Sequence, residues 1–270
     1  MKHQLYILVF ALCFAGCKKD TVIPHDISGP KLAFVKAATN GGVIVQSEYT
    51  YNEHGNIKTR TSYKDYAAGL MFSKTTFTYE SGKLIQSDGQ TDFSGSFFGS
   101  NYEYSRSAFE YSGNRIIQSN HYLKSGNDYT LRSFTVFTYD NAGHPVKQTR
   151  YLPDGTLLGY TLYTYEGNNV TVSEEYNQKQ PDPEPVLTLK RSYLHDDRRN
   201  PYKNVYHSIE NIPFSVNDNN ITAITTINHN SYLPSTPAQS IRSATTYVYN
   251  SLGYPERMNE NGNEFVLEYK

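Results

Sequence analysis

The chain has 270 residues, 37% of them hydrophobic, and a formal net charge of −1 at pH 7. This balance gives no electrostatic reason to expect a nucleic acid as partner. Both cysteines, Cys13 and Cys17, lie near the N-terminus, which excludes a disulfide framework, a thiolate metal site and a cysteine nucleophile from the remaining chain. The aromatic residues include 25 Tyr and 13 Phe but no Trp, and tyrosine suits surfaces that are half buried.

Residues 1–16 are expected to be a secretory signal. Lys2 precedes an apolar run from Leu5 to Ala15, which is too short to cross a bilayer. A buried N-terminal helix and a signal that is cleaved without lipidation are the alternatives. Residues 17–30 contain Pro and Gly and are expected to form a flexible tether.

The stretch FAGC, which ends at Cys17, resembles the bacterial lipobox. The resemblance implies cleavage before Cys17 and acylation of its thiol and its new amino group, and several acyl chains make a stable membrane anchor. The residue after the cysteine is Lys18, which by that family's sorting rule implies the outer membrane, on its periplasmic or its surface face.

Residues 31–270 are expected to form one domain of repeated β-hairpins. Each copy reads aromatic-x-Tyr, then a turn with glycine, then a run that alternates polar and β-branched residues. The central tyrosines are Tyr51, Tyr79, Tyr111, Tyr139, Tyr165 and Tyr249, and the first five stand 28, 32, 28 and 26 residues apart. Such a period in a chain rich in aromatic and β-branched residues is typical of one repeated supersecondary unit. A degenerate copy puts His195 at the tyrosine position, and FSVNDNNITAI could be a further copy with Val216 there.

Two details of the repeat carry structural predictions. Gly55, Gly143 and Gly253 each stand four residues after a repeat tyrosine, where a type I turn closed by a left-handed residue needs positive φ. Phe77 and Tyr79 stand two residues apart, so their rings point to the same face of a strand. We expect that face to be the core of the repeat, and a stacking platform for sugars or bases is the functional alternative.

The stretches YTYNEHGNIKTR and FTYDNAGHPVKQTRYLPDG resemble the YD repeat of the RHS family. That resemblance implies long β-sheets that wrap into shells or spirals. Together with the lipobox, the chain is more similar to Bacteroidota lipoproteins of unknown function that carry YD-like repeats, because DDRRNPYKN followed by FSVNDNNIT is similar to a recurring segment of theirs. Their fold is described as porin-like. The expected fold is therefore all-β, an antiparallel meander of hairpins that curves into a barrel-like or half-barrel sheet.

No catalytic motif and no cofactor-binding motif is found in the sequence. His195-Asp196-Asp197 could hold a divalent cation through hard oxygen ligands, but this run is more typical of a turn cap, and we predict no metal site. His54 and His144 adjoin turn glycines and are expected to be solvated.

The expected function is that of a lipid-anchored envelope protein that binds or scaffolds without catalysis, with a glycan or an envelope protein as partner. A membrane pore is one alternative, although Lys74, Arg132 and Arg242 interrupt one strand face and Ser and Thr occupy the middle of the other, so neither face is a lipid band. A hydrolase acting on envelope polysaccharide is the other alternative. It would use carboxylates such as those of Glu103, Glu174 and Glu175.

The repeat breaks between Tyr176 and Ile221, in a long irregular stretch of mixed charge. Long connections on a β scaffold are usually exposed and often carry binding residues. We therefore expect ligand contacts here, while a cap that merely closes the sheet is the alternative. The candidate contacts are Arg198, Arg199, Tyr202 and Tyr206.

Overall fold

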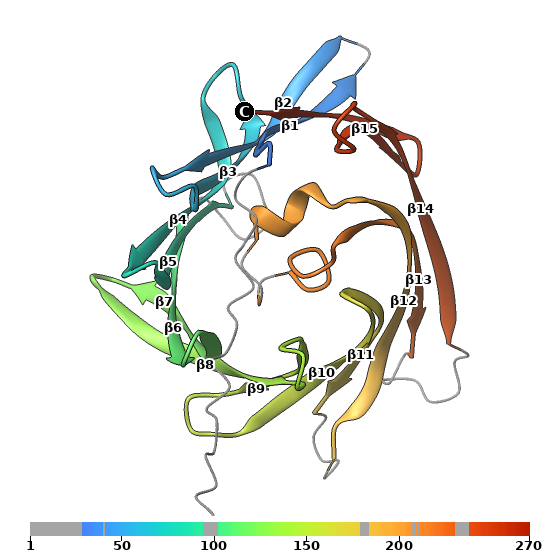
Figure 1. Ribbon diagram of the computed structural model, residues 1–270. Coiled ribbons are helices and arrows are strands. Elements are labelled where there is room, and N and C mark those ends of the chain that lie inside the picture. Colours follow the sequence, from blue (N-terminus) through green and yellow to red (C-terminus); the bar gives the residue numbers. More distant parts are fainter. Residues whose placement is uncertain are drawn as a thin grey trace, which may run out of the picture.

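The computed structural model describes residues 29–39, 41–93, 102–178, 184–206, 209, 211–229 and 238–270. The described strands form one closed antiparallel barrel in which each strand pairs with its neighbours in sequence and β16 pairs with β1 (Figure 1). The expectation of an all-β hairpin meander is confirmed, and closure selects the barrel over the half-barrel. The strands are β1 Leu32–Thr39, β2 Gly42–Tyr51, β3 Ile57–Asp65, β4 Leu70–Glu80, β5 Lys83–Asp92, β6 Tyr102–Ser112, β7 Arg115–Ser125, β8 Asp128–Tyr139, β9 Pro145–Tyr151, β10 Leu157–Glu166, β11 Asn169–Asn177, β12 Val186–Arg199, β13 Asn219–Asn228, β14 Gln239–Tyr249, β15 Pro255–Glu260 and β16 Asn263–Tyr269.

The tight turns of the repeat all lie at one end of the barrel, here called the turn end. Gly55, Gly143 and Gly253 have φ of 80°, 94° and 79°, and each donates its amide to the carbonyl three residues earlier, over 2.9–3.2 Å. The prediction of positive φ is confirmed at all three positions. His54 is exposed in its turn as expected.

The paired aromatic residues of the repeat face the barrel interior. Phe77, Phe109 and Phe137 are buried in one hydrophobic cluster with residues of the β12–β13 connection. Tyr163 and Tyr193 occupy the same place on β10 and β12. The predicted common face of aromatic-x-Tyr is therefore the core, as expected.

In most copies, the tyrosine that ends aromatic-x-Tyr forms a hydrogen bond to the adjacent strand. Its hydroxyl donates to a backbone carbonyl on the preceding strand, over 2.6–3.0 Å in every case. The pairs are Tyr51–Leu32, Tyr79–Ile57, Tyr111–Leu84, Tyr139–Ile116, Tyr165–Pro145 and Tyr269–Pro255. Burial raises the pKa of Tyr111 and of Tyr139 to about 12, which keeps these phenols protonated as donors.

The barrel closes through the same antiparallel pairing that joins its other strands. Leu32 pairs with Tyr269 across β1 and β16, and Lys31 and Lys270 exchange two backbone hydrogen bonds of 3.0 and 2.9 Å. Leu32 takes the buried position that Ile57 holds in the first complete hairpin. The two strands nearest the ends of the described chain thus supply the two halves of one further repeat.

The β12–β13 connection enters the barrel instead of extending from it. The described residues of this connection, 200–206, 209 and 211–218, are here called the plug and lie inside the ring of strands near the turn end (Figure 1). The plug begins with a 3-10 turn, Pro201–Asn204. Val216 belongs to the plug and packs against the Tyr163 cluster, so its interpretation as the tyrosine position of a further hairpin is wrong. His195 does face inward at the end of β12, in register with Ile221.

Candidate functional site

The plug is part of the folded core. Val205 is fully buried and Ile209 is 7% exposed, both in the cluster that contains Phe77. On the other side of the barrel, Ile212 and Phe214 pack against the Tyr163 cluster. A barrel of this strand number encloses more space than wall side chains alone can fill, and the plug occupies that space at the turn end.

Asn217 fastens the end of the plug to the barrel wall. Its side chain is completely buried, and its Oδ1 accepts the amide of Val170 on β11 over 2.8 Å. This bond fixes the orientation of the side-chain amide, so Nδ2 donates to His195 Nε2 at 2.9 Å. Asn200 at the start of the plug donates to the Asn217 carbonyl at 3.0 Å. Burial lowers the pKa of His195, against the opposing influence of Asp196 and Glu166.

The four candidate ligand contacts divide into two pairs. Arg198 and Arg199 end β12 and are exposed, with their guanidinium groups over the rings of Tyr249 and Tyr254 at 5.8 and 5.6 Å. Tyr202 and Tyr206 lie in the plug and pack against the core.

Tyr202 meets Phe214 edge to face at 6.4 Å, and burial raises its pKa well above the ordinary value. The Tyr206 ring lies 4.7 Å from the guanidinium of Arg60, which also stands over Phe77. The expectation of an exposed loop is therefore wrong for this pair, because the apolar side chains of the stretch are buried by turning inward. A ligand role for the exposed arginines stays a prediction.

The remaining polar groups of the break act as caps. Asp196 Oδ1 accepts the amides of Arg198 and Asn220 at 2.9 and 3.1 Å, and Tyr249 donates to its other oxygen. This is the turn-cap role that the sequence favoured. Among the described residues there is no group of three or more His, Cys, Asp or Glu side chains placed to hold a metal ion.

His144 departs from its expectation of a solvated turn residue. Its Nδ1 lies 3.0 Å from Asp140 Oδ2 and its Nε2 lies 3.1 Å from Asn168 Oδ1. Its ring stacks on Tyr165 at 4.6 Å. Two of these three partners, Asn168 and Tyr165, belong to the next hairpin. The sequence of the turn alone therefore could not predict them.

A polar surface covers the interior between the plug and the far end of the barrel, on strands β9 to β12. Arg150 faces inward because it pairs with Thr135, two residues before the buried Phe137. Its Nη2 lies 2.7 Å from Asn177 Oδ1 and 3.4 Å from Glu175 Oε1. The Arg150 side chain is 42% exposed and that of Glu175 is 29% exposed, so solvent reaches this inward-facing wall.

Deeper on the same wall, tyrosine hydroxyls are held by polar neighbours. Gln148 donates to the Tyr163 hydroxyl, and the Tyr193 hydroxyl lies 2.9 Å from Ser173 Oγ. Arg191 pairs with Ser173 in unbroken register and stands two residues before Tyr193, so it faces inward too. We call the inward face of these strands the polar wall. Its members are Gln148, Arg150, Tyr163, Ser173, Glu175, Asn177, Arg191 and Tyr193.

Sequence reasoning missed most of the polar wall. Only Glu175 was singled out, as a hydrolase carboxylate beside Glu174. The structure puts these two on opposite faces, since Glu174 bonds Lys190 at 2.7 Å on the outside and Glu175 meets Arg150 inside. The available signal was the alternation along β9 and β11, which becomes informative only once the inner face is known.

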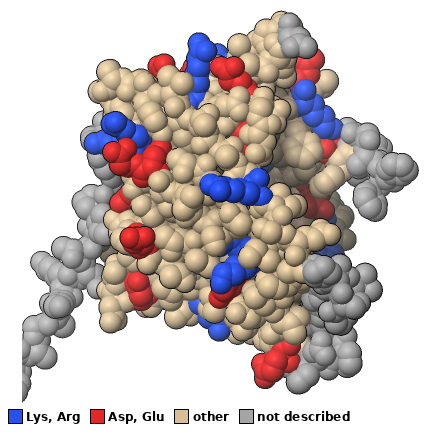
Figure 2. Space-filling model, turned by 90° about the vertical axis from the view of Figure 1, so that its right-hand side faces the viewer, with Lys and Arg blue, Asp and Glu red and all other residues tan. Residues whose placement is uncertain are grey.

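The outer face of the barrel mixes charged side chains with exposed apolar ones such as Leu194 and Val248. Ion pairs cross neighbouring strands between Arg106 and Asp88 at 2.8 Å and between Arg257 and Glu264 at 3.4 Å. Figure 2 views the side of the barrel that carries β14, and shows acidic and basic side chains scattered over it without a patch of one sign. In the described part of the chain, no helix has the length and apolar character needed to cross a membrane.

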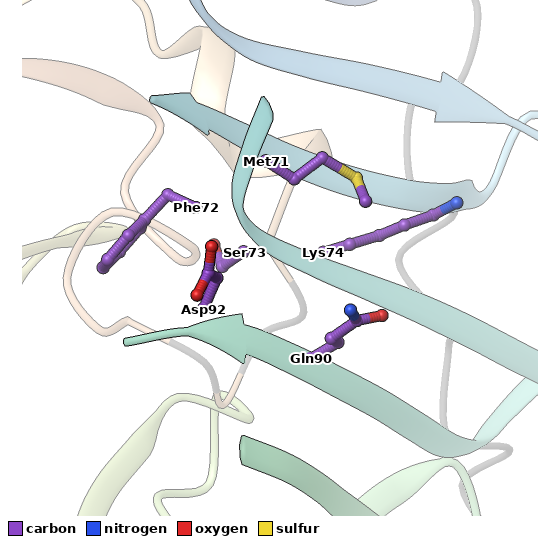
Figure 3. Close-up of a pocket in the computed structure, with 6 residues that line it drawn as sticks. All are labelled: Met71, Phe72, Ser73, Lys74, Gln90 and Asp92. Carbon is purple, nitrogen blue, oxygen red and sulfur yellow. The ribbon is translucent and has the colours of Figure 1, made fainter. Parts of the chain in front are cut away.

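A shallow hollow lies on β4 and β5 (Figure 3). It is lined by Met71, Phe72, Ser73, Lys74, Gln90 and Asp92 and has a volume of about 140 Å³, part of it open to solvent. That space is too shallow to enclose a water molecule, whereas small-molecule sites are clefts or cavities that bury most of the ligand. The hollow is therefore a poor candidate for an oligosaccharide or cofactor site.

Comparison with known proteins gives a structural likeness alone. No protein-family model matches the chain, and no curated protein matches it. Among solved structures, the chain is similar to a porin-like protein from Bacteroides uniformis, with 10% sequence identity and a TM-score of 0.49, over 87% of this chain and 96% of that one. At this level the likeness says nothing about activity, so function rests on the surfaces of the barrel itself.

Proposed function

We propose that the protein is a lipid-anchored barrel of the bacterial outer membrane that binds an envelope glycan or protein on its polar wall without catalysis. The observation that carries this proposal is the half-exposed Arg150–Glu175–Asn177 group on the inner face. The inner core at the turn end is apolar, whereas these charged and amide groups line a part of the inner face that solvent reaches. A polar, solvated inner surface above an apolar plug is suited to holding a ligand.

The membrane anchor is proposed from the lipobox resemblance at Cys17, which lies outside the described residues. The test is metabolic labelling of cells with a palmitate analogue, comparing the natural chain with Cys17→Ser. We expect label in the natural chain alone. Equal labelling of both would remove the anchor from the proposal.

Binding itself is tested by screening the purified chain on a glycan array and by pull-down from envelope extracts. We expect retention of at least one glycan or envelope protein that Arg150→Gln weakens. If the array and the pull-down both return nothing, the binding proposal fails.

The alternatives have less support. A pore needs an outer band of apolar side chains, and the outer face here carries ion pairs such as Arg106–Asp88, while the plug occupies the interior. A glycosidase needs two carboxyl groups that flank one bond. Glu174 and Glu175 face opposite sides of the sheet and cannot do so.

A further inference from the structure

The polar wall contains an arginine that the fold does not neutralise. Arg191 lies on β12 with its side chain inward and half buried. Arg150 has Glu175 as partner, and the outward Lys190 has Glu174. No described carboxylate forms an ion pair with Arg191, and its one recorded contact is with the Tyr193 hydroxyl on its own strand. Among the described residues, the Arg191 guanidinium therefore has no carboxylate partner inside the barrel.

A guanidinium in this setting selects a particular chemistry. Its planar fork of N–H donors matches carboxylate, sulfate and phosphate groups through two parallel hydrogen bonds. Outside bulk water such a bond is stronger than at an exposed surface. An anionic group would satisfy Arg191 in a way that a neutral ligand would not.

The remaining polar wall fits hydroxyl-rich molecules. Gln148 and Asn177 are half buried and carry amides, which donate and accept hydrogen bonds side by side, while the hydroxyls of Tyr163 and Ser173 are buried and are held by Gln148 and Tyr193. From β9 to β12 the wall spans three strand spacings, about 14 Å, which is long enough for several sugar rings.

The neighbouring arc of the interior leaves room for such a ligand. On β4 to β8 most inward positions above the aromatic layer are small and half buried, and His121, which pairs with Ser107 and Ser133, is a larger one. The small ones include Ser73, Thr75, Gly89, Ser105, Ser107, Ser119, Ser133 and Thr135. Beside the long polar side chains of β9 to β12, the inner face of β4 to β8 therefore occupies little of the interior.

We propose that the polar wall binds an acidic oligosaccharide, with Arg191 contacting its anionic group and Arg150, held by Glu175 and Asn177, contacting neighbouring oxygens. This inference rests on the proposed binding function and names the ligand class of the same site.

The test is an array that pairs uronate-, sulfate- and phosphate-bearing oligosaccharides with the same oligosaccharides lacking the acidic group. It is probed with the natural chain, Arg191→Gln, Arg191→Lys and Arg242→Gln. Arg242 is an exposed arginine on the outside of β14, so its variant makes the same charge change on the other face. Thermal melting confirms that each variant is folded.

We expect at least one acidic member to bind tenfold or more above its neutral counterpart. Arg191→Gln should remove that preference, Arg242→Gln should keep it, and Arg191→Lys should keep only part, because it retains the charge but loses the fork. If Arg191→Gln does not fold, Arg191→Lys decides alone, and an unchanged preference overturns the proposal.

The proposal is also overturned if acidic and neutral members bind alike, or if Arg242→Gln has the same effect as Arg191→Gln. Binding of neutral glycans or of a protein at the polar wall would leave the proposed function standing while this inference fails. Absence of any binding removes both.

Discussion

Replacement of Asn217 by Ala tests whether the plug is fastened to the barrel as described. The substitution leaves two partners inside the barrel without their hydrogen bonds, the amide of Val170 and Nε2 of His195. An unsatisfied buried group costs about 1–3 kcal/mol, so loss of both bonds should lower the free energy of unfolding by about 2–6 kcal/mol. Urea unfolding followed by far-UV circular dichroism measures it, with Asn141→Ala in an exposed turn as the matched control. Equal stability of the two variants would refute the reasoning.

A second variant separates the His195 bond from general loss of packing. Asn217→Asp keeps an acceptor for the Val170 amide but places a carboxylate oxygen opposite His195 Nε2. At pH 8, where His195 is neutral, the buried carboxylate has no positive charge beside it and the variant should be destabilised. At pH 5.5 a protonated His195 would form an ion pair with the carboxylate, so the loss should shrink. A loss that does not depend on pH would mean that residue 217 does not lie against His195.

Three further predictions concern the repeat and its pH dependence. The lowered pKa of His195 means that the folded state favours the neutral imidazole. The contribution of His195 to stability is therefore complete above a pH of about 6.5 and is lost as the pH falls through the lower pKa of the folded state. His195→Gln should flatten that part of the plot of stability against pH. Gly55→Val, Gly143→Val and Gly253→Val should each lower the free energy of unfolding by on the order of 1 kcal/mol or more, since a β-branched residue is poorly tolerated at positive φ, and unchanged melting of all three would contradict the turn geometry. Tyr139→Phe should cost about 1 kcal/mol in urea unfolding, because a buried carbonyl loses its donor, and a neutral effect would show that these hydroxyls do not hold the strands.

The hairpins were predictable because the rules that form them are local. A glycine four residues after Tyr51, and two rings spaced like Phe77 and Tyr79, depend on turn geometry and strand alternation within one copy. Closure was left open, since it depends on Leu32 meeting Tyr269 from the opposite end of the chain.

The plug and the polar wall were not predictable by the same means. Ile209 and Phe214 have no strand or helix periodicity, and they turn inward because the barrel has space to fill. Arg150 and Arg191 look like ordinary surface residues in sequence. Their significance depends on which face of each strand becomes the interior, and neighbouring strands decide that through register.

The most direct test of binding on the inner wall uses single cysteines in a Cys13→Ser, Cys17→Ser background, because the natural sequence has no cysteine besides these two. Ser133→Cys lies on the inward face of β8, two residues before the partner of Arg150, and Thr138→Cys lies on the exposed outer face of the same strand. Each is modified with a bulky maleimide, the extent of labelling is checked by mass, and the affinity for the best ligand from the screen is measured before and after. We predict at least a tenfold loss of affinity on modification at residue 133 and no change at residue 138. Unchanged affinity at residue 133, or an equal loss at both positions, would contradict binding inside the barrel.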